Sequence, residues 1–363
     1  MSSAPRCPHC RHFVYLSMRE CPNCEAELGF NLLDRQFYGI RQGQVVIDGV
    51  TWYTCSNRGW GCNWLVREDA PAGQCFSCRL TRRRPESDDT IALEKWGSVE
   101  EAKRRLLLQL GELGLPIVPW DVRPGGLGFD LISSLSTGER VIIGHANGII
   151  TIDLAESLDD RREALRVRLG EPYRTILGHL RHEVGHYYQN VLLGDDAAWA
   201  RCRELFGDER TSYQDAITRH YAQGAPQGWS ASYISEYATM HPWEDFAETF
   251  AHYLHITGTL RTAAAIGIHI DASVTNLRDT DVEPLLSYED QPVQRLLADW
   301  DWMSQAFNRI NRSMGFGDLY PFELVGPVRH KLAFVRDIVT KAPLSHDEQI
   351  ALALASHPDE ART

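Results

Sequence analysis

One short stretch decides how the larger part of this chain is expected to fold: residues 180–188, which read LRHEVGHYY. Its two histidines, His182 and His186, are four positions apart, so on an α-helix their side chains project from the same face. Apolar residues recur around them at helical spacing, and Gly194 suits the end of a helix. We therefore predict a helix over 172–193 that presents both imidazoles together.

This His-Glu-x-x-His spacing is typical of a zinc site. Two imidazole nitrogens on one helix face can bind one Zn²⁺, and Glu183, beside the first histidine, can accept a proton from a water molecule on the metal. In an extended version of the motif another histidine follows six residues after the second ligand, but Leu192 occupies that position. The third protein ligand therefore has to come from another part of the chain.

A second predicted helix is the best source of that ligand. Residues 242–250 read PWEDFAETF, where Pro242 suits a helix start, and Gly258 is expected to end the helix. Glu244 and Glu248 share one face because they are four residues apart. One of these carboxylates can bind zinc while the other accepts the N–H of a ligand histidine.

An HExxH helix followed by a distant ExxxE helix resembles the gluzincin class of zinc peptidases. Residues 237–250 are similar to the corresponding helix in the peptidase domain of anthrax lethal factor. The resemblance implies that Glu244 binds zinc together with the two histidines of the HExxH motif, and that Glu248 orients a ligand histidine. It also implies that Tyr237 hydrogen-bonds the oxyanion.

The role given to Tyr237 has two competitors. Tyr233 and His241 also lie shortly before Glu244 in the sequence. Each carries a polar group that can donate a hydrogen bond to the oxyanion formed when water attacks a carbonyl carbon. The choice among the three residues stays open at the level of sequence.

The distribution of cysteine is the second chemical feature of the chain, because eight of the nine cysteines precede residue 79. They form two sets of four: Cys7, Cys10, Cys21 and Cys24, then Cys55, Cys62, Cys75 and Cys78. Two cysteines separated by two residues place both thiolates on one side of a tight turn, and two such turns form a tetrahedral Cys₄ zinc site. The second set fits this pattern less closely, because six residues separate its first two members.

A disulfide framework is the alternative for these cysteines. It is disfavoured because nothing in the sequence marks export and disulfides rarely persist in a reducing cytosol. Each cysteine unit is also too small to bury a sufficient core, so a bound metal would supply its folding energy. We therefore expect two structural Zn²⁺ ions in the cysteine-rich part and one catalytic Zn²⁺ at the HExxH helix.

The region between the cysteines and the HExxH helix predicts a helix and a small sheet. Residues 98–113 read as an amphipathic helix, and 126–133 and 141–153 are rich in β-branched residues. Asn147-Gly148 favours a hairpin turn. The strand over 148–154 is expected at the sheet edge, where an extended peptide can pair with it.

Taken together, these features predict an α+β protein with N-terminal Cys₄ zinc ribbons and a mainly helical, zincin-like metallopeptidase domain that includes a small β-sheet. The expected divisions are a first ribbon over 1–30, a second ribbon-like module over 31–84 and a peptidase domain over 91–363. Residues 80–90 read as a linker because they combine an arginine run, a proline and several acids.

Composition excludes several classes of protein. With 363 residues, 43% of them hydrophobic and 24% charged, the chain is expected to form packed domains and is not a disordered protein. No apolar run reaches the roughly 18 residues of a membrane helix, and the start lacks the apolar core of a signal peptide, so a cytoplasmic protein is expected. Residues 1–84 carry eleven arginines against seven acids, whereas the whole chain has a net charge of −12. The acidic body argues against a broad nucleic-acid face, and the basic head leaves that partner open.

The whole chain resembles a bacterial family of zinc-binding metallopeptidases with an N-terminal zinc-ribbon domain. The matching features are both cysteine sets, the HExxH stretch, the Glu244 helix and residues 318–322, which read DLYPF. The implied function is hydrolysis of a protein or peptide substrate by a metal-activated water, with the ribbons recruiting the substrate or a protein partner. The alternative is a non-catalytic module that binds protein or nucleic acid through its ribbons and carries an inert peptidase scaffold.

Overall fold

The computed structural model describes residues 4–134, 141, 143–154, 175–275, 280–341 and 343–355. The chain forms two compact units: Met1–Arg161 together with Pro343–Thr363, and Arg162–Ala342. In the sequence, the second unit is therefore inserted between two stretches of the first. The predicted divisions at 1–30, 31–84 and 91–363 stay a prediction.

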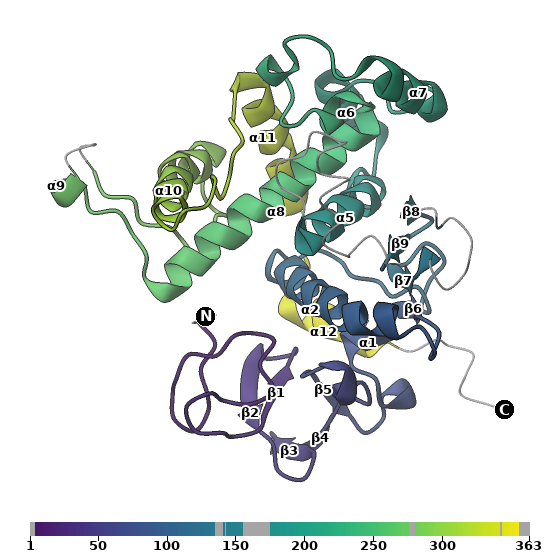
Figure 1. Cartoon of the computed structure of the whole chain (residues 1–363), viewed down its shortest axis with the longest axis vertical. Helices are drawn as coiled ribbons and strands as arrows, with labels where there is room; N and C mark the ends of the chain where they lie inside the picture. Colours follow the sequence, from purple (N-terminus) through teal and green to yellow (C-terminus); the bar gives the residue numbers. More distant parts are fainter. Residues whose placement is uncertain are drawn as a thin grey trace. The chain divides into compact units, whose positions relative to one another are not determined.

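The first unit begins with two small antiparallel sheets (Figure 1). One contains β1 (Leu28–Asn31) and β2 (Gln36–Gly39), and the other contains β3 (Gln44–Ile47), β4 (Val50–Thr54) and β5 (Leu65–Arg67). Two 3₁₀ turns, η1 (Arg58–Trp60) and η2 (Pro71–Gly73), flank β5. The backbone N–H of Phe30 in β1 donates to the carbonyl of Asn63, which joins the two halves of this region.

The rest of the first unit is built on a four-stranded sheet. Its elements are α1 (Phe76–Arg79), β6 (Thr81–Arg83), α2 (Thr90–Glu112), β7 (Gly128–Ile132), β8 (Gly144–Ala146), β9 (Ile149–Asp153) and α12 (His346–Leu354). The strand order is β6-β7-β9-β8, with only β8 and β9 antiparallel among these pairs. The predicted hairpin is confirmed, since Asn147 and Gly148 both have the positive φ that its tight turn requires.

Two expectations about this sheet are wrong. The strand expected at the edge, 148–154, is β9, which pairs with β7 on one side and with β8 on the other. The segment expected to be a linker, 80–90, contains β6, where Arg82 forms a 2.6 Å ion pair with the buried Asp130. Both errors have one cause: parallel pairing joins segments far apart in the sequence and leaves no local signal.

Helix α2 also begins earlier than predicted, at Thr90 instead of Ser98. The carboxylate of Asp89 caps it by accepting the backbone N–H of Ala92 at 2.9 Å. Ala92 and Trp96 are buried in the added turns. Packing of these two side chains therefore extends the helix beyond the amphipathic stretch visible in the sequence.

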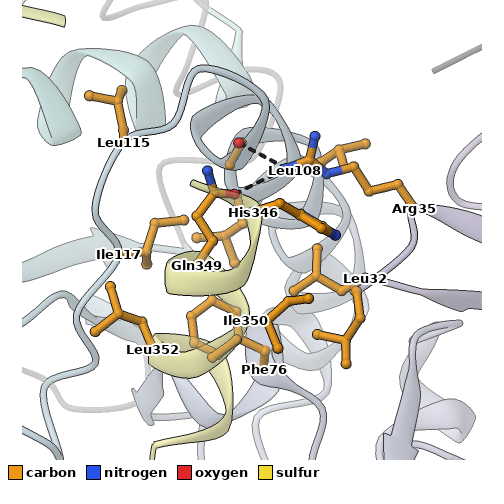
Figure 2. Close-up of a pocket in the computed structure, with 14 residues that line it drawn as sticks. Leu32, Arg35, Phe76, Leu108, Leu115, Ile117, His346, Gln349, Ile350 and Leu352 are labelled. Carbon is orange, nitrogen blue, oxygen red and sulfur yellow. Dashed lines mark hydrogen bonds between the residues drawn. The ribbon is translucent and has the colours of Figure 1, made fainter. Parts of the chain in front are cut away.

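A small apolar pocket lies against α12 within the first unit (Figure 2). Leu107 from α2 and Ile350 from α12 are among the side chains that line it. At its rim, Arg35 donates to the carbonyl of Gly111 at 2.9 Å and to the side-chain oxygen of Gln349 at 3.0 Å. No cysteine or carboxylate lines this pocket, so it offers no set of metal ligands.

Among the described residues, the second unit consists of helices and their connections, with one isolated antiparallel bridge between Ile270 and Val282. Its elements are α5 (Ile176–Leu192), α6 (Asp196–Phe206), α7 (Tyr213–Gln223), η3 (Trp229–Ala231), η4 (Tyr237–Thr239), α8 (Pro242–Ile266), α9 (Ala272–Thr275), α10 (Val293–Ser313) and α11 (Gly326–Thr340). The predicted α+β class, with cysteine clusters ahead of a mainly helical remainder and a small sheet, is confirmed. No helix among the described residues combines the length and the apolar character needed to span a membrane.

The two helices predicted to hold the site are both present, with shifted ends. Pro172, the expected start of the first, lies outside the described residues, and α5 begins at Ile176 after a Thr175 cap. Helix α8 begins at Pro242 as predicted but does not end at Gly258. It continues because Leu260 and other side chains beyond that glycine are buried, and this packing outweighs the roughly 1 kcal/mol cost of a glycine inside a helix.

Helices α5 and α8 pack against each other in the second unit (Figure 1). They lie close together at Gly185, where an added β-carbon would lie 2.8 Å from the α-carbon of Ala247. One turn further along, the rings of Tyr188 and Phe250 stack with their centroids 5.4 Å apart. This contact places the HExxH face of α5 opposite the carboxylates of α8.

Candidate metal centre and active site

Three buried side chains meet where α5 faces α8. His182 and His186 come from α5 and Glu244 from the first turn of α8, and their ligand atoms all lie within 4.8 Å of one another. Glu244 Oε2 is 2.9 Å from His182 Nε2 and 3.4 Å from His186 Nε2. A single oxygen of Glu244 therefore faces both imidazoles.

Further side chains hold this cluster in place. His182 Nδ1 lies 2.7 Å from Glu248 Oε1, and because a carboxylate only accepts, the ring nitrogen is the donor. Glu248 Oε2 accepts the hydroxyl of Ser235, also at 2.7 Å. The ring of Trp243 stacks on that of His186 at a centroid distance of 5.2 Å. With Nδ1 of His182 committed to Glu248, its Nε2 is the nitrogen left to bind a metal.

The electrostatics of the cluster favour a positive charge at its centre. Burial opposes a charge on His182, but hydrogen bonds to Glu244 and Glu248 raise its pKa well above the ordinary value. Burial would raise the pKa of Glu244, but the neighbouring His186 and the hydrogen bond from His182 hold it well below its usual range. At Glu248 the hydrogen bond from His182 likewise outweighs burial and lowers the pKa to about 2. Both carboxylates are therefore ionised at neutral pH.

The donor set suits zinc. Two imidazole nitrogens and one carboxylate oxygen are the protein ligands of one common kind of catalytic zinc site, which keeps its fourth position for water or substrate. All three candidate ligand side chains are buried, and the Glu248 carboxylate behind His182 supplies the kind of outer hydrogen bond that such sites have. The residues present therefore fit a zinc ion.

The predicted water-activating residue lies beside this cluster. Glu183 follows His182 on α5 and is buried, with Oε1 3.7 Å from His179 Nε2. Of the three candidates for oxyanion binding, Tyr237 in η4 packs its ring 5.8 Å from that of His182.

The two competitors of Tyr237 make other contacts. The ring of Tyr233 covers the ammonium of Lys331 at 4.3 Å. His241 caps α8 and accepts the backbone N–H of Trp243. Among the three candidates, Tyr237 is thus the one whose ring lies against a predicted ligand.

Sequence reasoning missed residues that reach the cluster from other elements. The hydroxyl of Tyr213, in α7, donates to Glu244 Oε1 at 2.8 Å. Asp245, next to Glu244, forms a buried 2.6 Å ion pair with Lys331 of α11. No spacing pattern links these pairs, because their members lie 31 and 86 positions apart in the sequence. An exposed tyrosine at a helix start and a lysine in an apolar helix carry no signal of such contacts.

The eight N-terminal cysteines gather into two clusters with the membership predicted from the sequence. In each, the four sulfur atoms lie within 4.8 Å of one another. The nearest sulfurs are 3.6 Å apart in both, for example Cys7 to Cys24 and Cys62 to Cys75. The disulfide alternative is wrong, since all nine cysteines are free thiols.

The first cluster owes its shape to two equivalent turns. The N–H of Arg11 donates to the carbonyl of Cys7, and the N–H of Glu25 donates to that of Cys21. Arg11 and Glu25, each directly after the second cysteine of a pair, adopt φ values of 64° and 56°. The repeated left-handed residue turns each pair toward the common centre.

Two clusters of four cysteines and a buried His₂Glu cluster are the candidate metal sites among the described residues. The chain belongs to the family described as "Putative zinc-binding metallo-peptidase", which matches residues 92–338, and residues 5–89 match a zinc-ribbon domain. The family descriptions and the two Cys₄ clusters together support zinc as the bound metal.

Three mycobacterial proteins are similar to this chain over nearly its whole length. They are an uncharacterized protein of Mycobacterium bovis and uncharacterized proteins of two strains of Mycobacterium tuberculosis. Each is 44% identical over 336 residues, which cover 92% of this chain and 94% of the relative. No solved structure matches the chain.

Proposed function

We propose that this protein is a zinc-dependent peptidase whose catalytic metal is held by His182, His186 and Glu244. The observation that carries the proposal is the meeting of these three buried donors, from two helices, directly beside Glu183. A purely structural His₂Glu cluster would not need an adjacent carboxylate.

The chemistry divides between the metal and the chain. When bound, zinc would supply Lewis-acid chemistry, which lowers the pKa of a water molecule and polarises the scissile carbonyl. The carboxylate of Glu183 accepts the proton of the attacking water and returns it to the leaving amine. Glu248 holds His182 in the tautomer that leaves Nε2 free for the metal.

Tyr237 is our choice for the residue that stabilises the oxyanion. Its ring packs 5.8 Å from that of His182, and this neighbourhood supports the choice. A phenol donor placed where negative charge develops lowers the barrier without accepting a proton itself. Tyr233 and His241 are the alternatives.

The N-terminal ribbons have a different role in this proposal. Two structural zinc ions fold the cysteine-rich modules, which we place at 1–30 and 31–84, ahead of a peptidase domain over 91–363. The modules recruit the protein or peptide substrate, or a protein partner that delivers it. A ribbon module that binds protein or nucleic acid on an inert scaffold is the competing function, and the complete set of Glu183 and three metal ligands favours the enzyme.

The test uses the full chain and the Glu183→Gln variant. We expect three zinc ions per chain in both proteins, cleavage of a fluorogenic peptide library by the wild type, and at least a 1,000-fold loss of cleavage in the variant. Two zinc ions in the wild type, or equal cleavage by both proteins, would contradict the proposal.

A further inference from the structure

The two carboxylate oxygens of Glu244 have separate partners. Oε2 faces His182 and His186, the two imidazoles of the cluster. Oε1 points to the other side and accepts the hydroxyl of Tyr213 at 2.8 Å. Because the partners lie on different oxygens, the carboxylate is held in one orientation about its long side chain.

We propose that Tyr213 is a positioning residue that makes Glu244 bind the metal through one oxygen. The inference rests on the proposed function, in which Glu244 is the third zinc ligand. A carboxylate with both oxygens free can bind a metal through either or both of them. With Oε1 engaged by the phenol, only Oε2 is presented, and the remaining position of a four-coordinate zinc stays open for water or substrate.

The surroundings of Tyr213 show that this contact is built into the site. Tyr213 is the first residue of α7, and the Ser212 hydroxyl caps that helix. Its ring packs edge-on against His241, the residue that caps α8 just before Glu244, with centroids 5.3 Å apart. The phenol is therefore anchored at the same helix end that carries the carboxylate.

Helix α7 buries few of its own side chains. Ala216 is its single buried residue, and the side chain of Tyr213 remains 41% exposed although its hydroxyl reaches the buried Glu244. Other residues of α7 also hold it in place: Arg219 donates to the carbonyl of Met240 at 3.3 Å, and the ring of His220 packs on that of Tyr237. Removing that hydroxyl should affect the metal site more than the fold.

The experiment measures zinc affinity separately from activity. In the full chain, Tyr213→Phe is expected to weaken zinc binding at the His₂Glu site by 10- to 100-fold, measured by competition with a chelator, while the two cysteine-bound zinc ions remain. Tyr221→Phe, which makes the same change at an exposed tyrosine of the same helix, is the matched control. Tyr237 also hydrogen-bonds Tyr213, so Tyr237→Phe is expected to lower kcat with a smaller loss of zinc affinity than Tyr213→Phe, because it leaves the bond from Tyr213 to Glu244 in place.

A double substitution shows whether the phenol acts through Glu244. In a Glu244→Gln background, adding Tyr213→Phe should cause no further loss of zinc affinity. A loss of affinity in Tyr213→Phe below twofold, or a full additional loss in the double variant, would overturn the inference. Failure of the proposed function gives a different result from failure of this inference. In that case the wild-type protein itself lacks the third zinc ion or the peptidase activity.

Discussion

Gly185 lies directly against the backbone of Ala247, so the glycine of the HExxH motif is a point of close backbone contact between α5 and α8. A β-carbon at Gly185 would come within 2.8 Å of Ala247 Cα and 3.0 Å of its carbonyl oxygen. His182 and His186 flank this point on one helix, and Glu244 and Glu248 flank it on the other. The close approach therefore sets the separation of the proposed metal ligands.

The first prediction concerns this helix crossing. Gly185→Ala should lower the free energy of unfolding by about 1–3 kcal/mol, because the added methyl group overpacks a rigid backbone contact. It should also remove the zinc of the His₂Glu site by pushing the ligands apart. Denaturant unfolding and zinc analysis measure the two effects.

Gly97→Ala is the matched control for that substitution. It adds the same methyl group inside helix α2, where the nearest atom is the Trp60 carbonyl oxygen at 3.5 Å. It should leave zinc content unchanged and alter stability little. Equal behaviour of the two variants would show that the contact with Ala247 does not constrain the site.

The second prediction concerns the hydrogen bond behind His182. Glu248→Ala should weaken zinc binding at this site by about 10- to 100-fold, since His182 loses the acceptor that orients its ring. Ser235→Ala removes only the hydroxyl that supports Glu248 and should have a smaller effect. Chelator competition gives both values, and an unchanged affinity in the Glu248 variant would rule out the orienting role.

The third prediction concerns acid stability. His252 is buried, its Nδ1 lies 2.7 Å from the hydroxyl of Tyr320, and burial lowers its pKa to about 4. An unfolded histidine has a pKa near 6.5, so between these values the unfolded chain binds more protons. Stability should therefore fall as the pH drops from about 6.5 to 4, by about 3 kcal/mol in total from this residue.

Unfolding midpoints at a series of pH values test this expectation. His252→Gln should flatten the acid-side slope, because the variant has no group that takes up this proton. His269→Gln, which changes an exposed histidine, is the control and should retain the wild-type slope. A wild-type slope in the His252 variant would argue against the effect of burial.

The fourth prediction concerns the order in which the cysteine clusters lose zinc. The first cluster includes the exposed Cys24, whereas all four cysteines of the second are buried. A thiol-reactive reagent should therefore release zinc in two phases, with the fast phase from the first cluster. A metal-sensitive dye follows the release of zinc. The fast phase should be absent in Cys24→Ser and present in Cys62→Ser. The reverse result would contradict the assignment of the fast phase to the first cluster.

The local sequence pattern was sufficient to predict features that depend only on residues close together in the sequence. The tight turn at Asn147-Gly148 and the start of α8 at Pro242 follow from residues within a few positions. The end of α8 could not be predicted in this way, because packing beyond Gly258 decides it. The interior position of β9 could not be predicted either, because a parallel partner strand, β7, decides it. Each error arose where a distant contact outweighed a local preference.

The sequence by itself determined which side chains could act together along one element. The i, i+4 spacing put His182 and His186 on one face of a helix, and the cysteine spacing defined the two sets of four thiols. Only the tertiary structure decided what lies opposite them. It brings Glu244 to the histidines and Tyr213 to the far oxygen of Glu244, because the close contact of α5 with α8 and the placement of α7 depend on packing that no local pattern encodes.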